Sequence, residues 1–217
     1  EAIEDALRHG QRKALLAMAT GTGKTRTALG LIYRFVKSGL FNRVLFLVDR
    51  RSLGQQAFET FQTVKLESQR SFTEIYDAKS LDEGFVEIDT RLSIATIQSM
   101  VRRVLDPEGD STPPRIDQFD CIIVDECHRG YNLDREMDEV EMEFRDHEDY
   151  ISKYRRVLDH FDAVRIGLTA TPALETSEIF GEPVYLYRYE QAVMEGHLVD
   201  QDPPFKLATH LSKHGIE

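Results

Sequence analysis

The residues whose types and spacing best fit a chemical role form one segment near the start of the chain: Thr20, Gly21, Thr22, Gly23, Lys24 and Thr25. The segment follows a short apolar run and precedes apolar residues at helical spacing, which predicts a strand, a loop and a helix. Gly21 and Gly23 let the loop turn so that successive N–H groups face one anion, and the helix dipole adds positive potential. The pattern predicts an ATP site where Lys24 reaches the β- and γ-phosphates and Thr25 holds Mg²⁺.

Two departures from known phosphate-loop patterns limit this assignment. Met18 stands where the strict Walker pattern has glycine, so the match is to its tail, Gly-x-Gly-Lys-Thr. Arg26 occupies the third glycine position of the dinucleotide fingerprint, which excludes that fingerprint. The alternative is a chance string in a surface turn, and the flanking strand and helix patterns argue against it.

A second group of chemically suited residues follows the apolar run 121–124, which predicts a buried parallel strand. Asp125 and Glu126 come directly after this run, where ligands bind in open α/β sheets. Asp125 is suited to Mg²⁺, directly or through a water, while Glu126 can orient and deprotonate the water that attacks the γ-phosphate. An acidic surface turn is the alternative, and the phosphate loop in the same chain disfavours it.

The rest of the chain alternates between helical and strand patterns. Helices are predicted over 2–9, 24–37 and 53–64, strands over 44–48, 72–76, 92–96, 121–124 and 163–168, and a loop over 106–114. This alternation predicts an α/β fold with a mostly parallel sheet and helices on both of its faces.

Length and composition fit one intracellular globular domain. The 217 residues are 41% hydrophobic and 30% charged, enough to bury a sizeable core. No apolar run approaches a membrane span and no signal peptide precedes the first motif, so we expect no membrane association and a cytoplasmic location. Cys121 and Cys127 are expected to be reduced thiols, and two cysteines with scattered histidines give no four-ligand zinc spacing.

Residues 134–149 hold nine carboxylates and two arginines and supply much of the net charge of −11. Leu133, Met137, Val140 and Phe144 recur at helical spacing, which predicts an amphipathic helix with a solvated acidic side. A docking surface for a basic partner is the alternative. Because negative charge repels DNA, this helix is expected to lie away from any DNA track.

A third apolar run, 163–168, leads into Thr169-Ala170-Thr171-Pro172 and completes a recognisable set. Ala-Thr-Gly-Thr-Gly-Lys-Thr (19–25), Asp-Glu-Cys-His (125–128) and Leu-Thr-Ala-Thr-Pro (168–172) resemble motifs I, II and III of superfamily 2 helicases and translocases. These motifs cover the first of the two RecA-like motor domains in that superfamily. Flanking segments narrow the resemblance to the motor (restriction) subunit of type I restriction enzymes: 46–53, 95–100, 125–131, 180–185 and 192–200.

The resemblance implies a RecA-like P-loop NTPase domain over residues 1–199, and over 200–217 the start of a linker toward a second RecA-like domain. ATP and Mg²⁺ would be its cofactors, with Thr25 and Asp125 as metal ligands. Three residues would be catalytic: Lys24, Asp125 and Glu126. Three would couple the nucleotide state to the second domain and to DNA: His128, Thr169 and Thr171.

The matching family positions also imply contacts with the DNA backbone after two further strands: Arg50, Arg51 and Gln55 after one, Thr96 and Gln98 after the other. Such side chains suit phosphate oxygens and carry no sequence information. Each alone is more simply an ordinary helix-start or loop residue. The acidity of the whole chain argues against nucleic-acid binding unless local groups hold the DNA.

The resemblance therefore implies an ATP-dependent translocase that moves duplex DNA in a complex with methyltransferase and specificity subunits. We expect the isolated segment to be nearly inactive, because it lacks the arginine finger of a second motor domain. One alternative is another superfamily 2 helicase. An alternative of a different class is a nucleotide-dependent binding module or scaffold without turnover, which the intact Lys24, Asp125 and Glu126 disfavour.

Overall fold

Short apolar segments form the strands of one parallel sheet in the computed structural model, which describes residues 1–80, 89–107, 113–127 and 147–200. Within these residues, seven strands lie in the order β3-β4-β2-β5-β6-β1-β7, and each neighbouring pair is parallel. Their bounds are β1 Lys13–Met18, β2 Val44–Val48, β3 Ala78–Ser80, β4 Leu92–Thr96, β5 Cys121–Val124, β6 Val164–Thr169 and β7 Pro183–Tyr187. The central strands β2, β4 and β5 are buried along their whole length, as expected for a sheet that is covered on both faces.

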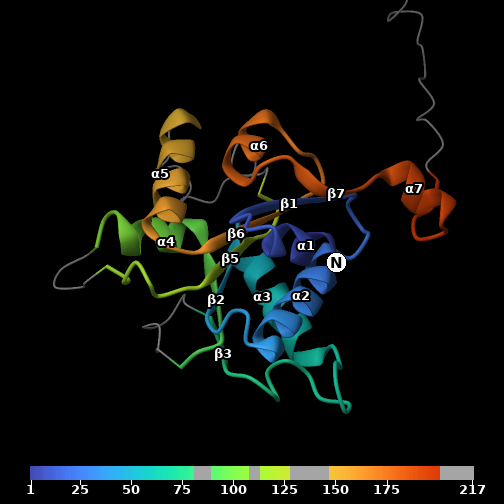
Figure 1. The fold of residues 1–217 in the computed structure, drawn as a ribbon, viewed down its shortest axis with the longest axis horizontal. Coiled ribbons are helices and arrows are strands. Elements are labelled where there is room, and N and C mark those ends of the chain that lie inside the picture. The colour runs from blue at the N-terminus through green and yellow to red at the C-terminus, as the bar shows by residue number, and fades with distance from the viewer. Residues whose placement is uncertain (81–88, 108–112, 128–146, 201–217) are drawn as a thin grey trace, which may run out of the picture.

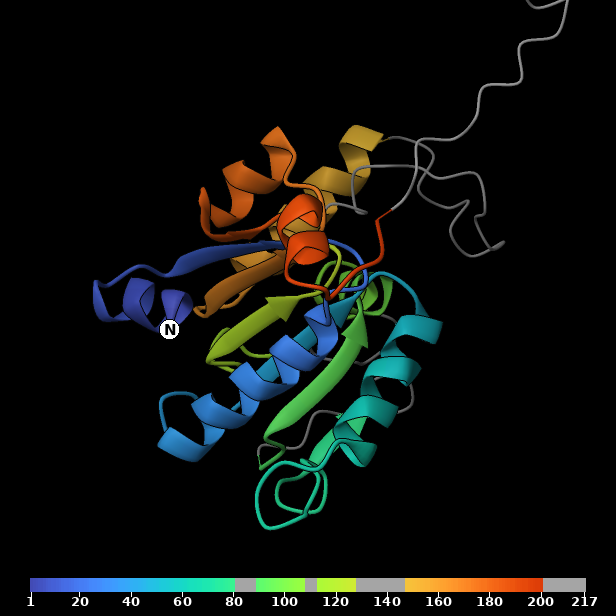
Figure 2. The same ribbon diagram turned by 90° about the vertical axis from the view of Figure 1, so that its right-hand side faces the viewer.

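Helices cover both faces of the sheet (Figures 1 and 2). One face packs against α1 (Ala2–Arg8), α2 (Lys24–Ser38) and α3 (Arg51–Thr63), and the other against α4 (Ile97–Val104), α5 (His147–His160) and α6 (Leu174–Phe180). Successive strand residues alternate between these two cores: Phe46 joins the first and Leu45 the second. A last helix, α7 (Tyr189–Met194), follows β7. This arrangement confirms the predicted α/β fold.

The register brings the ends of three strands that are distant in sequence to one edge of the sheet. Ala17 near the end of β1 lies beside Thr169 of β6, and Val124 of β5 lies beside Gly167 of the same strand. A Cβ atom on Gly167 would come within 2.8 Å of the Phe180 ring and 3.0 Å of the Cys127 sulfur. Glycine at this position therefore lets α6 and the segment after β5 close onto the sheet.

Most predicted elements agree with the structure within two residues, and one predicted strand is wrong. Residues 72–76 form a turn, in which Ile75 and Tyr76 donate backbone hydrogen bonds to the Phe72 carbonyl at 3.0 and 2.8 Å. The Phe72 ring packs 5.4 Å from the Tyr76 ring and 5.6 Å from that of Phe61. In a strand, four residues of extended chain would separate Phe72 from Tyr76 by about 13 Å. The aromatic contacts thus favour a turn over an extended segment.

Several earlier expectations fall wholly or largely outside the described part of the chain, among them the loop 106–114 and the linker 200–217. The predicted acidic helix, 134–149, lies outside it except for its last three residues, which belong to α5. The candidate coupling residue His128 also lies outside it. Among the described residues, no helix has both the length and the apolar character needed to cross a bilayer.

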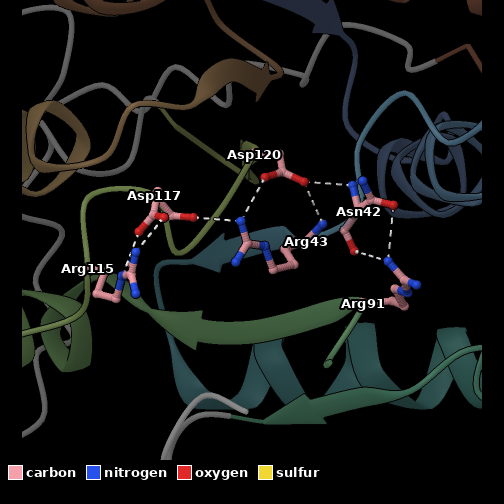
Figure 3. Close-up of polar contacts among 6 residues, drawn as sticks. All are labelled: Asn42, Arg43, Arg91, Arg115, Asp117 and Asp120. Atoms are coloured by element: carbon pink, nitrogen blue, oxygen red, sulfur yellow. Dashed lines mark hydrogen bonds and ion pairs between the residues drawn. The ribbon is translucent and has the colours of Figure 1, made fainter. Parts of the chain in front are cut away.

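A polar network joins the amino ends of β2, β4 and β5 (Figure 3). We call it the amino-edge cluster, and its members are Asn42, Arg43, Arg91, Arg115, Asp117 and Asp120. Asp120 accepts hydrogen bonds from the backbone N–H groups of Asn42 and Arg43, at 2.7 and 3.1 Å, and from the Arg43 guanidinium at 3.3 Å. Both Asp117 and Arg91 extend the network through further hydrogen bonds. The cluster thereby ties the starts of neighbouring strands together.

Candidate functional site

The loop between β1 and α2 has the backbone geometry that the sequence predicts for a phosphate loop. Gly21 and Gly23 have φ values of +84° and +89°, a region that favours glycine. The Thr22 hydroxyl donates to the Ala19 carbonyl at 2.6 Å and the Thr22 amide to the same carbonyl at 3.3 Å, which closes the loop into a turn. Gly23, the residue before α2, forms no side-chain cap, so the positive end of the helix dipole faces the loop.

Lys24, the first residue of α2, is buried and points back across the loop. Its ammonium group lies 3.4 Å from the Met18 carbonyl oxygen and 3.2 Å from Oε1 of Glu126. The side chains of Lys24 and Glu126 are 7% and 17% exposed, so this ion pair is largely shielded from water. Beside it, the Thr25 hydroxyl donates to Oδ2 of Asp125 at 3.4 Å. We call these four residues, Lys24, Thr25, Asp125 and Glu126, the carboxyl-edge site.

The two carboxylates of this site are held by the sheet itself. The Asp125 amide donates to the Leu47 carbonyl of β2, and the Cys127 amide to the Leu168 carbonyl of β6, both at 2.9 Å. Glu126 between them has a φ of +49°, which is uncommon for a residue with a side chain. Because both neighbours are fixed to flanking strands, the left-handed conformation is retained.

Burial raises the pKa of the Asp125 carboxyl above its usual value, and the neighbouring negative charge of Glu126 raises it further. The Glu126 backbone N–H, which donates to Oδ1 of Asp125 at 3.0 Å, and the positive charge of Lys24 act in the opposite direction. The net direction is upward. A carboxylate in this state gains most from a cation placed beside it.

The oxygens of Thr25 and Asp125 fit the requirements of a magnesium ion. Mg²⁺ has oxygen ligands at 2.0–2.1 Å in octahedral geometry, which places adjacent ligands about 3 Å apart. The two oxygens are already 3.4 Å apart. In the described residues, no group of three or more His, Cys, Asp or Glu side chains converges. A magnesium ion here would take one or two protein oxygens and would be completed by phosphates and water.

The coupling candidates Thr169 and Thr171 lie at the end of β6, beside the end of β1. The buried Thr169 hydroxyl donates to the Thr171 carbonyl at 3.0 Å and accepts from the Thr171 amide at 3.2 Å. These bonds fix the turn that follows the strand. Because β6 is a neighbour of β1, both threonines lie beside the strand that leads into the phosphate loop.

The candidate DNA contacts lie apart from this site, after β2 and β4. Arg50 and Arg51 stand at the start of α3, and Gln55 in its second turn donates to Glu59 at 3.4 Å. Thr96 is buried and caps α4, accepting from the Ser99 amide at 3.2 Å, while Gln98 lies in the first turn of that helix. The described structure brings none of these side chains into contact with the carboxyl-edge site.

One contact of the phosphate loop was missed by the sequence reasoning. A Cβ atom on Gly21 would lie 3.2 Å from Cδ2 of Leu198, so Leu198 packs directly over this glycine. An open cavity of about 1090 Å³ adjoins the contact, and its lining includes Thr20, Thr171, Tyr189 and Leu198. Only folding brings residues so distant in sequence together, and no local pattern around Leu198 indicates the contact.

Comparison with known proteins finds relatives among restriction enzymes. A family model described as "Type III restriction enzyme, res subunit" matches residues 1–174. The type I restriction enzyme EcoKI endonuclease subunit of Escherichia coli (strain K12) is 52% identical to this chain over 215 residues. The match covers 99% of this chain and 18% of that subunit, so the chain spans less than one fifth of the relative's length.

Solved structures share the fold at lower identity. An ATP-dependent type ISP restriction-modification enzyme, LlaBIII, bound to DNA, matches with a TM-score of 0.59 and 20% identity over 89% of this chain and 15% of that chain. The Hef helicase domain of Pyrococcus furiosus matches with a TM-score of 0.53 and 20% identity, over 81% of this chain and 34% of that chain. These likenesses confirm the predicted RecA-like α/β fold.

Proposed function

The chain belongs to the restriction-enzyme family described as type III restriction enzyme, res subunit, and on this premise we propose that it is an ATP-dependent DNA translocase motor. The similarity to restriction-enzyme subunits supports a helicase-like motor domain. The proposal is more specific: the domain binds Mg-ATP, hydrolyses it, and couples hydrolysis to movement on duplex DNA within a type I restriction endonuclease.

The observation that carries this proposal is the meeting of two motifs at one edge of the sheet. Lys24 contacts Glu126 at 3.2 Å, and Thr25 contacts Asp125 at 3.4 Å. A cation, a hydroxyl and two carboxylates beside a glycine-rich loop are the set that phosphoryl transfer to water requires. None of the four occupies an exposed surface position.

Each residue of the site has a distinct role in the proposed reaction. The loop amides from Thr20 to Gly23 bind phosphate oxygens, and Lys24 neutralises charge on the β- and γ-phosphates. Thr25 and Asp125 hold Mg²⁺, which when bound offsets the negative charge of the phosphates. Glu126 orients the attacking water and accepts its proton. To do so, Glu126 must exchange its contact with Lys24 for one with water.

The proposal extends to the chain beyond the site. We assign residues 1–199 to the motor domain and 200–217 to the start of a linker toward a second RecA-like domain, which would supply an arginine finger. His128, Thr169 and Thr171 couple nucleotide state to that domain and to DNA. Methyltransferase and specificity subunits are the proposed partners. Because duplex DNA and ATP are the substrates, we place the protein in the cytoplasm.

For DNA, we propose sequence-independent contacts with the phosphate backbone. Arg50 and Arg51 stand where no side chain caps α3, so helix dipole and guanidinium groups offer positive potential together. Gln55 lies one turn further along the same helix. The Thr96 hydroxyl oxygen already accepts a hydrogen bond as the cap of α4, so Thr96 would contact DNA by donating its hydroxyl hydrogen. Gln98 lies in the first turn of the same helix.

The decisive experiment is the substitution Glu126→Gln in the intact protein. Mg-ATP binding should persist, because the amide keeps the shape of the side chain. DNA-stimulated hydrolysis should fall by about 10²- to 10⁴-fold, because the amide cannot accept a proton. Translocation, followed by displacement of a triplex-forming strand, should stop. The matched control is Glu178→Gln, which alters a surface carboxylate paired with Arg155 and should leave all three measurements unchanged.

The outcomes separate this proposal from its alternatives. Normal translocation by Glu126→Gln would show that Glu126 is not the catalytic base. An unsubstituted protein that binds ATP yet never hydrolyses it with DNA present would be a nucleotide-dependent scaffold. An unsubstituted protein that separates strands without displacing the triplex would be another kind of superfamily 2 helicase.

A further inference from the structure

The segment from Arg188 to Val199, which we call the α7 segment, begins beside the phosphate loop and contacts it near its end. Just before the segment, the Ala19 amide donates to the carbonyl of Tyr187, the last residue of β7, at 2.9 Å. At its end, Leu198 packs over Gly21, where an added Cβ would meet Cδ2 of Leu198 at 3.2 Å. Leu198, from the other end of the described chain, therefore flanks Gly21, which is otherwise exposed.

Internal bonds hold Leu198 in this position. The amides of His197 and Leu198 both donate to the carbonyl of the buried Ala192, at 2.8 and 3.1 Å. The Tyr189 hydroxyl donates to the Val199 carbonyl at 2.8 Å, which closes the segment on itself. Leu198 also packs against the hydrophobic core that includes α1 and α2. These hydrogen bonds and the contact with the core together fix the position of Leu198.

We infer that Leu198 is a positioning residue for nucleotide binding: it holds the backbone of Gly21 in the left-handed conformation that directs the loop amides toward phosphate. Glycine at φ +84° has no side chain to restrict it, so its conformation depends on the contacts around it: the bonds from Thr22 to the Ala19 carbonyl within the loop, and Leu198 from outside it. A loop that is ordered before the ligand arrives loses less entropy on binding. This inference rests on the proposed function, because it concerns the same phosphate loop.

The test compares Leu198→Ala with Leu198→Met and Val199→Ala in the intact protein. Mg-ADP affinity is measured by calorimetry, and amide hydrogen exchange is measured at residues 19–23. Leu198→Ala should weaken Mg-ADP binding roughly threefold to tenfold and speed exchange in the loop. Leu198→Met should restore both, because methionine can fill the same space. Val199→Ala is the matched control, because the Val199 side chain is 86% exposed and its carbonyl is retained.

A second variant keeps the test valid if Leu198→Ala fails to fold. Tyr189→Phe removes the hydroxyl that bonds to the Val199 carbonyl and creates no cavity over Gly21; it should give a smaller change in the same direction. Unchanged affinity and exchange in Leu198→Ala would overturn the inference while leaving the proposed function intact. If the unsubstituted protein does not bind Mg-ADP, and Lys24→Ala therefore causes no loss of Mg-ADP affinity, the proposed function is overturned instead.

Discussion

The two edges of the sheet each carry a cluster of charged residues, and the two clusters differ in how their carboxylates are bonded. In the amino-edge cluster, Asp120 accepts three hydrogen bonds at 2.7 to 3.3 Å, and two of them come from backbone amides (Figure 3). In the carboxyl-edge site, the contacts of Lys24 and Thr25 with the two carboxylates are 3.2 and 3.4 Å long. The shortest bonds to Asp120 come from the backbone, whereas the contacts of Lys24 and Thr25 with the two carboxylates run between side chains and are longer than 3 Å.

The carboxyl groups of the two clusters also differ in their exposure and in the direction of their pKa shifts. Asp117 lies at the surface, and its hydrogen bonds with Arg115 lower the pKa of its carboxyl. The pKa of Asp125 is raised, because burial outweighs its partners. A buried charge reduces stability when its protein partners do not offset the loss of its hydration. Proteins retain such charges at sites where a bound ligand supplies the missing interaction. The comparison shows how a ligand site differs from a structural ion network within one sheet.

The amino ends of two helices also differ. Thr96 caps α4 by accepting from the Ser99 amide, which satisfies part of that helix end internally. Gly23, the residue before α2, forms no side-chain cap, and the same holds for the residues before α1, α3, α6 and α7. The missing cap alone therefore does not mark α2 as a binding site; what distinguishes α2 is the loop before it, with two glycines of positive φ.

The strongest test of this contrast exchanges one cation in each cluster for alanine. Lys24→Ala should weaken Mg-ATP binding by about 10- to 100-fold, because charge-assisted hydrogen bonds to phosphate are lost. Arg43→Ala removes a cation of the amino-edge cluster and should leave the affinity unchanged. Calorimetry on both variants provides the measurement. Equal affinities for Lys24→Ala and the unsubstituted protein would end the phosphate-loop assignment.

A second test measures stability instead of binding. Asp120→Ala should lower the free energy of unfolding by about 1–2 kcal/mol, because two backbone amides and a guanidinium lose their acceptor. Asp125→Asn should leave the free energy of unfolding unchanged or raise it, since it removes a buried charge that the site compensates poorly. Urea unfolding followed by circular dichroism distinguishes them. A large destabilisation by Asp125→Asn would show that the carboxyl-edge site is structural.

The smallest expected effect is a difference in titration between two aspartates. By carbon NMR, Asp125 should titrate above the usual value of 3.8 and Asp117 below it. The folded protein binds the Asp125 proton more tightly than the unfolded chain, so this group's contribution to stability falls as pH rises from 3.8 through the folded pKa. The contribution of Asp117 has the opposite sign: it is present above 3.8 and is lost as pH falls through the lowered pKa. Titrations that coincide would remove the electrostatic distinction between the clusters.

Local patterns in the sequence were sufficient to predict the framework of the site. The turn and the helix start after β1 were predictable because Gly21 and Gly23 lie close together and directly precede Lys24. Asp125 was predictable because a four-residue apolar run must be buried and must end at the sheet edge. In a parallel sheet these edges coincide, so proximity of the two motifs followed from topology alone.

Features set by contacts between distant residues were not predictable in the same way. The segment 72–76 has the composition of a strand, and only the packing of Phe72 between Phe61 and Tyr76 selects the turn. The position of Leu198 over Gly21 depends on the path of β7 and α7, which no periodicity in the sequence encodes. The cap formed by Thr96 was likewise not foreseen, although a threonine before a helical pattern is a recognised signal.

The position of β1 within the sheet has a consequence for the order in which the protein folds. Leu16 of β1 lies between Leu168 of β6 and Tyr185 of β7, so within the described residues the first strand pairs only with the last two. Such distant pairings form slowly, because closing a long loop costs entropy before any contact compensates for it. We therefore expect β2, β4 and β5 to assemble first and β1 to dock last. During synthesis, the loop that follows β1 would gain its shape only after residue 187 has left the ribosome.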